Sequence, residues 1–175
     1  MGEKQIVVED SPEALAKLIT ERRARLVAID GSDGVGKTTL ARSIAKLINA
    51  TAIDLDSYVN KNQGAFVAAL RIDELKQTLE AAFLLGRPAI VSSICIRDAL
   101  CRAGYHTDLA IYVEKRSPVG VPQDLDFVYA EDPTEPVQNE WYGDLHKELW
   151  WYHRNFRPHS NADVIYIRRE RPSLG

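Results

Sequence analysis

The feature that most constrains this chain is a glycine-rich turn between an apolar run and a helical pattern. Residues 31–38, GSDGVGKT, satisfy the spacing G-x-x-x-x-G-K-[ST]. Residues 26–30 before the turn are typical of a short buried strand, and apolar residues recur at helical spacing after it, to position 48. Glycines in such a turn let successive backbone N–H groups point into one concavity, which the positive end of the following helix extends. The stretch therefore predicts a cradle for phosphate groups.

Each part of this P-loop has an expected task. Lys37 is expected to reach the β- and γ-phosphates of ATP, and the Thr38 hydroxyl is expected to ligate Mg²⁺. The residues predicted to bind the nucleotide are consecutive: Gly31, Ser32, Asp33, Gly34, Val35, Gly36, Lys37, Thr38 and Thr39. The same loop serves kinases, ATPases, GTPases and proteins that only bind nucleotide, so the reaction depends on the rest of the site.

Strand patterns alternate with helix patterns along the chain, which favours an α/β fold with a parallel sheet. We expect a single domain over residues 1–175 with the three-layer P-loop NTPase fold, in which helices cover both faces of a five-stranded parallel sheet. The expected strands are 26–30, 51–54, 89–95, 109–113 and 164–168. Residues 139–156 predict an aromatic-rich helix. Residues 117–138 hold four prolines and several carboxylates, fit neither period, and form a candidate lid.

Composition narrows the partners and the compartment. The formal net charge is −3, so no basic field favours a nucleic-acid or anionic membrane partner. The chain shows no apolar core of signal-peptide length and no run long enough to span a bilayer. Its two cysteines, Cys95 and Cys101, lack the paired spacing of a zinc site. These observations favour a cytoplasmic protein with reduced thiols that acts on a small molecule, and they leave its oligomeric state open.

Two further stretches carry a resemblance to a known family. Together with the P-loop, DLDSYV at 54–59 and WWYHRNFRPHSNADVIYIR at 150–168 resemble the uridine kinase-like group of P-loop small-molecule kinases. Residues 56–58, Asp-Ser-Tyr, fall where that family carries an Asp-x-Phe-Tyr type sequence. The resemblance implies an ATP site at the P-loop and transfer of a phosphoryl group to a hydroxyl of a nucleoside or small metabolite.

Transfer to an alcohol needs a carboxylate that orients the hydroxyl and accepts its proton. Asp56 lies just past the end of a predicted strand, where open α/β sheets bind ligands, and is our candidate for this base. Asp54 competes for the role, or touches Mg²⁺ through water. Arg157 completes the predicted catalytic set with Lys37 and Asp56. It shares a helix face with Arg154, and the pair either contacts phosphate or lies solvated beside the acids of 117–138.

The sequence departs from the family at two places. The family's third strand ends in an acid followed by glycine, whereas residues 90–93 here read IVSS. The family's lid carries several arginines, whereas residues 117–138 are acidic, so that the acids face water, the lid meets a basic substrate, or catalysis is weak. The alternative function is therefore a nucleotide-binding regulatory or degenerate P-loop protein without phosphotransfer. A third is an NTPase or assembly-partner domain.

Overall fold

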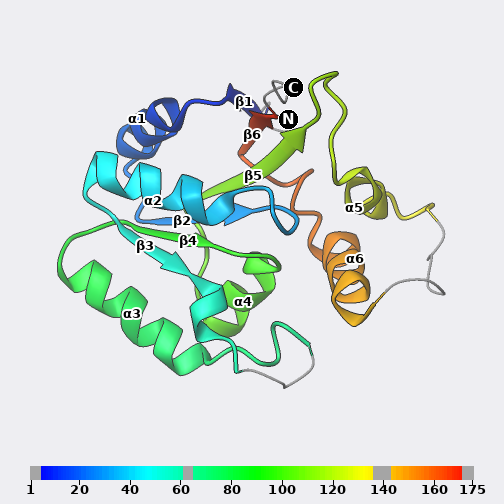
Figure 1. Ribbon diagram of the computed structural model, residues 1–175. Coiled ribbons are helices and arrows are strands. Elements are labelled where there is room, and N and C mark those ends of the chain that lie inside the picture. Colours follow the sequence, from blue (N-terminus) through cyan, green and yellow to red (C-terminus); the bar gives the residue numbers. More distant parts are fainter. Residues whose placement is uncertain (1–4, 61–64, 136–142, 171–175) are drawn as a thin grey trace, which may run out of the picture.

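A six-stranded parallel sheet lies at the centre of the protein (Figure 1). The computed structural model describes residues 5–60, 65–135 and 143–170. The strand order is β1-β6-β5-β2-β4-β3. The strands are β1 (Ile6–Glu9), β2 (Leu26–Asp30), β3 (Thr51–Asp54), β4 (Ala89–Ser92), β5 (Leu109–Arg116) and β6 (Val164–Arg169).

The sheet has one strand more than the five predicted. The additional strand is β1, which pairs with β6 at one edge of the sheet and places Ile6 beside Val164. It has four residues, of which every second one is exposed, and it lies in a charged N-terminal stretch without the continuous apolar run of a central strand. The five predicted strands are present, although β4 ends at Ser92 and β5 continues to Arg116.

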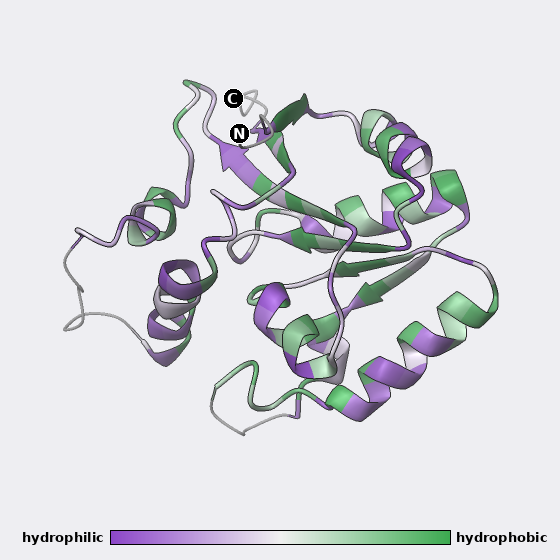
Figure 2. Ribbon diagram, turned by 180° about the vertical axis from the view of Figure 1, so that it is seen from behind, coloured by the Kyte–Doolittle hydropathy of each residue, from purple (hydrophilic) through white to green (hydrophobic). Residues whose placement is uncertain are grey.

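Helices cover both faces of the sheet, as predicted (Figure 1). On one face α1 and α2 pack against the strands around Leu15, Ile19 and Ile44. On the other face α3, α4 and α6 enclose a second core around Leu79 and Leu100. Figure 2 shows the strands as mainly hydrophobic ribbons between helices of mixed character. The longer helices are α1 (Pro12–Arg22), α2 (Lys37–Ile48), α3 (Ile72–Leu84), α4 (Ile96–Ala103) and α6 (Asp144–Phe156).

The described part of the candidate lid, residues 117–135, contains a helix that its composition did not indicate. This short helix, α5 (Leu125–Ala130), packs against α6 beyond the ends of the strands (Figure 1). The Phe127 ring stacks on His153 at 5.3 Å between ring centroids. Residues 136–138 lie outside the described residues, as do 139–142 of the predicted late helix, which is described from Asp144.

The strand order determines which loops meet. Strand β2 lies between β5 and β4, and β3 follows β4 at the edge. The strands are parallel, so the turns after β2, β3 and β4 all leave from the same edge of the sheet. No helix in the described part of the chain is long and apolar enough to cross a bilayer. Both cysteines are free, as expected.

Candidate functional site

The glycine-rich turn joins the carboxyl end of β2 to the first residue of α2. Gly31 has φ 138°, and a Cβ at this position would lie 2.7 Å from the Val113 carbonyl oxygen, so only glycine fits. Gly36 precedes α2 with φ 95°, and no side chain caps the helix there. The first N–H groups of α2 are therefore left for an anion at the positive end of the helix, as the phosphate cradle requires.

Lys37 lies across the loop that precedes it. Its side chain is buried, and Nζ donates a hydrogen bond to the Ser32 carbonyl oxygen at 2.5 Å. Burial lowers the pKa of Lys37, and the carboxylate of Asp30 is the strongest of the nearby groups that oppose this shift. A phosphate beside Nζ would favour the charged ammonium in the same way, so the position suits the predicted contact.

The carboxylates after β3 face the start of α2. The Thr38 hydroxyl donates a hydrogen bond to Oδ2 of Asp54 at 3.0 Å, and Oδ1 of Asp54 accepts from the Asp56 backbone N–H at 3.2 Å. A short 3₁₀ helix, Leu55–Tyr58, begins here and holds Asp56 next to Asp54. Burial raises the pKa of Asp56, and the adjacent Asp54 raises it further, while Lys37 acts in the opposite direction. The structure thus brings together the two carboxylates that competed for the role of base.

The end of β4 carries hydroxyls where the family has an acid. Ser92 pairs in register with Asp54 on β3 and with Ile29 on β2. Ser92 and Ser93 are buried, and neither Oγ has a hydrogen-bond partner among the described residues. The carboxylate next to Thr38 therefore comes from β3, which lies one strand further from the P-loop strand than β4, where the family that the sequence resembles carries its acid.

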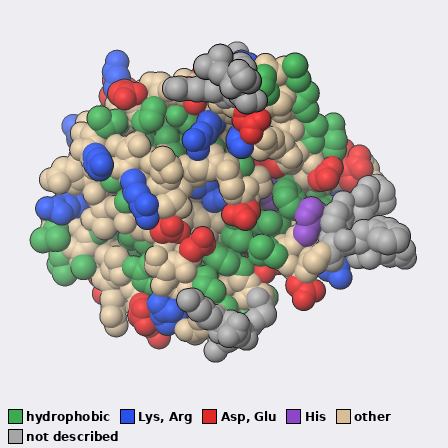
Figure 3. Space-filling view, in the orientation of Figure 1, with side chains coloured by type: hydrophobic (Ala, Val, Ile, Leu, Met, Phe, Trp, Pro, Cys, Tyr) green, Lys and Arg blue, Asp and Glu red, His purple; other side chains and the backbone are tan. Residues whose placement is uncertain are grey.

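The P-loop, the two carboxylates after β3 and Ser93 line one pocket of about 570 Å³. One side is the P-loop and the carboxylates, and the other side is largely apolar. Acidic and hydrophobic side chains lie next to one another across the middle of the corresponding face (Figure 3). The pocket is lined by Asp33, Gly34, Gly36, Lys37, Thr38, Thr39, Asp54, Asp56, Val59, Phe66, Ser93, Ile94 and Leu145. Its size and mixed walls are those of a small-molecule site.

Lys37 is the only Lys or Arg in the described lining of this pocket. Arg154 donates to the backbone oxygens of Pro133 and Glu135, and its guanidinium lies 4.5 Å from the Trp150 ring centroid. It therefore lies beside the 117–138 segment, as in the second of its two predicted positions, but it is half-buried and contacts backbone oxygens rather than being solvated beside the acids. Arg157 is exposed at the C-terminal end of α6, with φ 47°, and is not brought to the pocket. Its predicted catalytic role stays a prediction.

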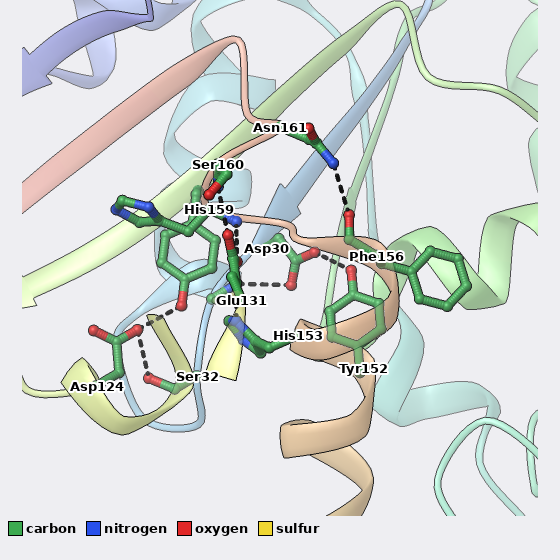
Figure 4. A network of polar contacts seen from close by, with 12 residues as sticks. Asp30, Ser32, Asp124, Glu131, Tyr152, His153, Phe156, His159, Ser160 and Asn161 are labelled. Carbon is green, nitrogen blue, oxygen red and sulfur yellow. Dashed lines mark hydrogen bonds and ion pairs between the residues drawn. The ribbon is translucent and has the colours of Figure 1, made fainter. Parts of the chain in front are cut away.

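A buried network at the base of the P-loop was not predicted (Figure 4). Asp30 ends β2, and its Oδ1 accepts from the Gly31 N–H at 2.8 Å while Oδ2 accepts from the Tyr152 hydroxyl. The Tyr152 oxygen in turn accepts from the Arg97 N–H at 3.2 Å. Burial raises the pKa of Asp30, and the hydrogen bond from Tyr152 lowers it in part. Tyr152 thereby ties α6 and α4 to the first peptide of the P-loop.

Two acids of the 117–138 segment point into the protein rather than into water. Asp124 accepts from the Tyr112 hydroxyl at 2.6 Å and from the Ser32 hydroxyl at 3.3 Å (Figure 4). Glu131 accepts from the backbone N–H groups of His159 and Ser160, both at 2.8 Å. The alternative in which all these acids face water is thus wrong, because two of them hold the segment against the P-loop and the turn after α6.

Sequence reasoning also missed two contacts that shape the site. Arg168 on β6 donates to the Val35 carbonyl oxygen at 3.3 Å, and its guanidinium lies against Gly36. Glu148 on α6 accepts from the N–H groups of Phe66 and Val67, at 2.7 and 3.0 Å, and so fixes one wall of the pocket. Neither contact belongs to a motif, since each joins residues more than 80 positions apart.

Comparisons with known proteins bear on the fold. No family model and no curated protein sequence matches the chain. Among solved structures, the chain is similar to a possible uridine kinase from Bacillus stearothermophilus, with a TM-score of 0.55 and 13% sequence identity over 89% of this chain and 96% of that one. The chain has a P-loop NTPase-like fold, with a six-stranded sheet.

Proposed function

We propose that this protein is an ATP- and Mg²⁺-dependent phosphotransferase that moves the γ-phosphoryl group to a hydroxyl of a small metabolite or nucleoside. One observation carries the proposal: Lys37, Thr38, Asp54 and Asp56 line the same pocket, and Thr38 is hydrogen-bonded to Asp54. The P-loop residues 31–39 bind the phosphates through backbone N–H groups and Lys37. The likeness to a possible uridine kinase supports this reading.

The oxygen atoms beside the P-loop suit magnesium. Mg²⁺ prefers hard oxygen ligands and keeps several waters when it binds next to phosphates. The Thr38 hydroxyl and Asp54 Oδ2 are 3.0 Å apart and supply such oxygens. Thr38 would hold the ion directly and Asp54 through its water shell. When bound there, Mg²⁺ neutralises charge on the β- and γ-phosphate oxygens.

Asp56 is the proposed base because it lines the pocket and is not used by Thr38. The acceptor oxygen forms a bond to the γ-phosphorus, and the bond from that phosphorus to the β,γ-bridging oxygen breaks. The electron pair of the broken bond leaves with ADP, and the acceptor proton moves to the Asp56 carboxylate. The raised pKa of Asp56 suits a proton acceptor. Arg157 is retained as the proposed cation for the transferring group, provided that its exposed side chain turns towards the pocket.

A nucleotide-binding protein without phosphotransfer is the second candidate. It is favoured by Ser92 at the end of β4 and by the lack of arginine in the described lining of the pocket. Such a protein binds ATP and leaves it intact with every acceptor. A cytoplasmic location and the absence of nucleic-acid or membrane partners remain part of both proposals.

The deciding experiment follows ADP and inorganic phosphate separately while ATP is offered with a panel of nucleosides and small alcohols. ADP that appears only with one acceptor, without free phosphate, supports the phosphotransferase. Asp56→Asn then lowers turnover by about 100-fold or more and changes ATP affinity by less than about threefold. Unchanged turnover in this variant would reject Asp56 as the base. Asp54→Asn is the matched comparison, and it should instead raise the Mg²⁺ concentration needed for half-maximal activity.

A further inference from the structure

The charged groups of the pocket do not balance. The described lining holds three carboxylates, on Asp33, Asp54 and Asp56, against the single ammonium of Lys37. Lys37 points to the loop, where its Nζ bonds to a carbonyl oxygen, and Asp54 is bonded to Thr38. MgATP bound at the P-loop adds further negative charge to this pocket. An acceptor molecule that enters this pocket therefore meets a net negative charge.

The wall away from the P-loop contains no cation in its described part and is mainly apolar. Val59, Phe66, Ile94 and Leu145 form it, and the backbone of Phe66 is held by the Glu148 carboxylate. An aromatic ring and aliphatic side chains beside carboxylates suit an organic cation, because the ring face attracts the positive charge and the carboxylates balance it.

The lining also contains a buried hydroxyl, just after β4 and beside β2, that has no partner among the described residues. Ser93 lines the pocket, is 3% exposed, and its Oγ makes no hydrogen bond within the described residues. A buried hydroxyl without a partner costs free energy, so a polar ligand atom at this end of the pocket is favoured. This feature is independent of the carboxylates and indicates an occupant with a polar atom at that place, while the charge of the occupant is argued from the carboxylates alone.

We infer that the acceptor is a positively charged alcohol, such as an amino alcohol, a quaternary ammonium alcohol or a cationic nucleoside. The inference rests on the proposed phosphotransfer. An anionic acceptor is disfavoured, since a second negative group would be desolvated next to Asp56 and the nucleotide phosphates without a cation from this wall.

The test uses acceptors matched in shape and differing in charge. One set is choline, its neutral isostere 3,3-dimethylbutan-1-ol, and 4-hydroxybutyrate. The other is 3-methylcytidine, which is cationic at pH 7, with neutral uridine and anionic orotidine. The full chain is assayed for ADP formation with each, and binding of each is measured calorimetrically with Mg²⁺ and a non-hydrolysable ATP analogue. We expect kcat/KM and affinity to favour the cation at least about tenfold within a set, and less at high salt.

Leu145→Lys tests the charge of the pocket directly, with Leu145→Gln as its matched neutral control. Leu145 is 46% exposed in the first turn of α6, so both side chains fit without repacking of the core. The lysine should reduce the preference for the cationic acceptor by about tenfold relative to the glutamine.

The outcomes separate the inference from the function on which it rests. A preference for neutral or anionic acceptors, or binding of none of them, would overturn the inference. Preferential phosphorylation of an anionic or neutral acceptor would do so while supporting phosphotransfer. Selective binding of the cations without any transfer of phosphate would support the inferred ligand class and reject the proposed reaction.

Discussion

Replacing Tyr152 by phenylalanine tests the buried network under the P-loop. The variant loses one hydroxyl and keeps the ring, which is packed in the core with Phe156. The hydroxyl donates to Oδ2 of Asp30 and accepts from the Arg97 N–H. Asp30 and Tyr152 are each only 4% exposed, so water does not replace the lost partner. A buried carboxylate oxygen and a backbone donor are left unpaired.

The expected loss of stability follows from these two groups. A hydrogen bond to a charged group contributes about 1.5–3 kcal/mol, and an orphaned buried donor adds to this, so we expect a loss of about 2–4 kcal/mol. For a chain of this length the melting temperature should fall by roughly 5–15 °C. Burial raises the pKa of Asp30 in the folded protein, so folding favours its protonated form and this contribution is lost as pH rises through the folded-state pKa. The hydroxyl opposes that shift, so the deficit of Tyr152→Phe should grow with pH.

The measurement is urea and thermal unfolding at pH 5 and pH 8. Tyr58→Phe is the matched control, because the Tyr58 hydroxyl bonds to the neutral Thr78 hydroxyl at 2.8 Å in a partly buried site. The control should lose about 1 kcal/mol with little pH dependence. Equal losses in both variants at both pH values would refute the assignment of Tyr152 as the partner of an ionisable buried group.

Three other changes test the P-loop and the contact between Glu114 on β5 and His159. Lys37→Ala should abolish turnover and weaken ATP binding at least about tenfold in a calorimetric titration, and parental affinity would contradict the phosphate cradle. Gly31→Ala should destabilise the fold by about 2–4 kcal/mol in thermal unfolding, because φ is 138° and the new Cβ meets the Val113 carbonyl oxygen; an unchanged melting temperature would reject this geometry. The hydrogen bond to His159 lowers the pKa of Glu114. Glu114 therefore stabilises the folded protein at pH values above its ordinary pKa, and this stabilisation is lost as pH falls through the lowered pKa. Glu114→Gln should therefore cost about 1 kcal/mol at pH 7 and flatten the acid side of the stability profile, and a profile like the parent's would argue against the contact.

The P-loop and the central strands could be predicted because their signals are local. Glycine at 31 and 36 is required by backbone geometry at those positions, and the strand Leu26–Asp30 is a continuous apolar run because both its faces are covered. Strand β1 was missed because it is an edge strand of four residues, half of them exposed, and it has neither a continuous apolar run nor a glycine that the backbone requires. The short helix Leu125–Ala130 was missed for a similar reason, because six residues among prolines and acids are too few to show a helical period.

The part of the site that could be predicted consists of residues close in sequence to the ends of the predicted strands. Asp54 and Asp56 were placed near the P-loop because they follow a strand that ends at the same edge of the sheet. The partner of Asp30 could not be found in this way, since Tyr152 lies 122 positions away and buried polar pairs have no spacing rule. Nor does composition distinguish an acid that faces water from one that, like Asp124, accepts hydrogen bonds inside the protein.

The serine at the end of β4 and the aspartate at the end of β3 are best understood together. Ser92 and Asp54 are directly paired across the two strands, and Thr38 reaches Asp54 at 3.0 Å. A carboxylate at position 92 would stand beside the half-buried Asp54, and the two negative charges would repel each other. With serine there, Asp54 has no second acid next to it on β4. Compared with the family that the sequence resembles, the metal-side carboxylate of the proposed site therefore lies one strand further from the P-loop strand, and the proposed Mg²⁺ dependence rests on Asp54.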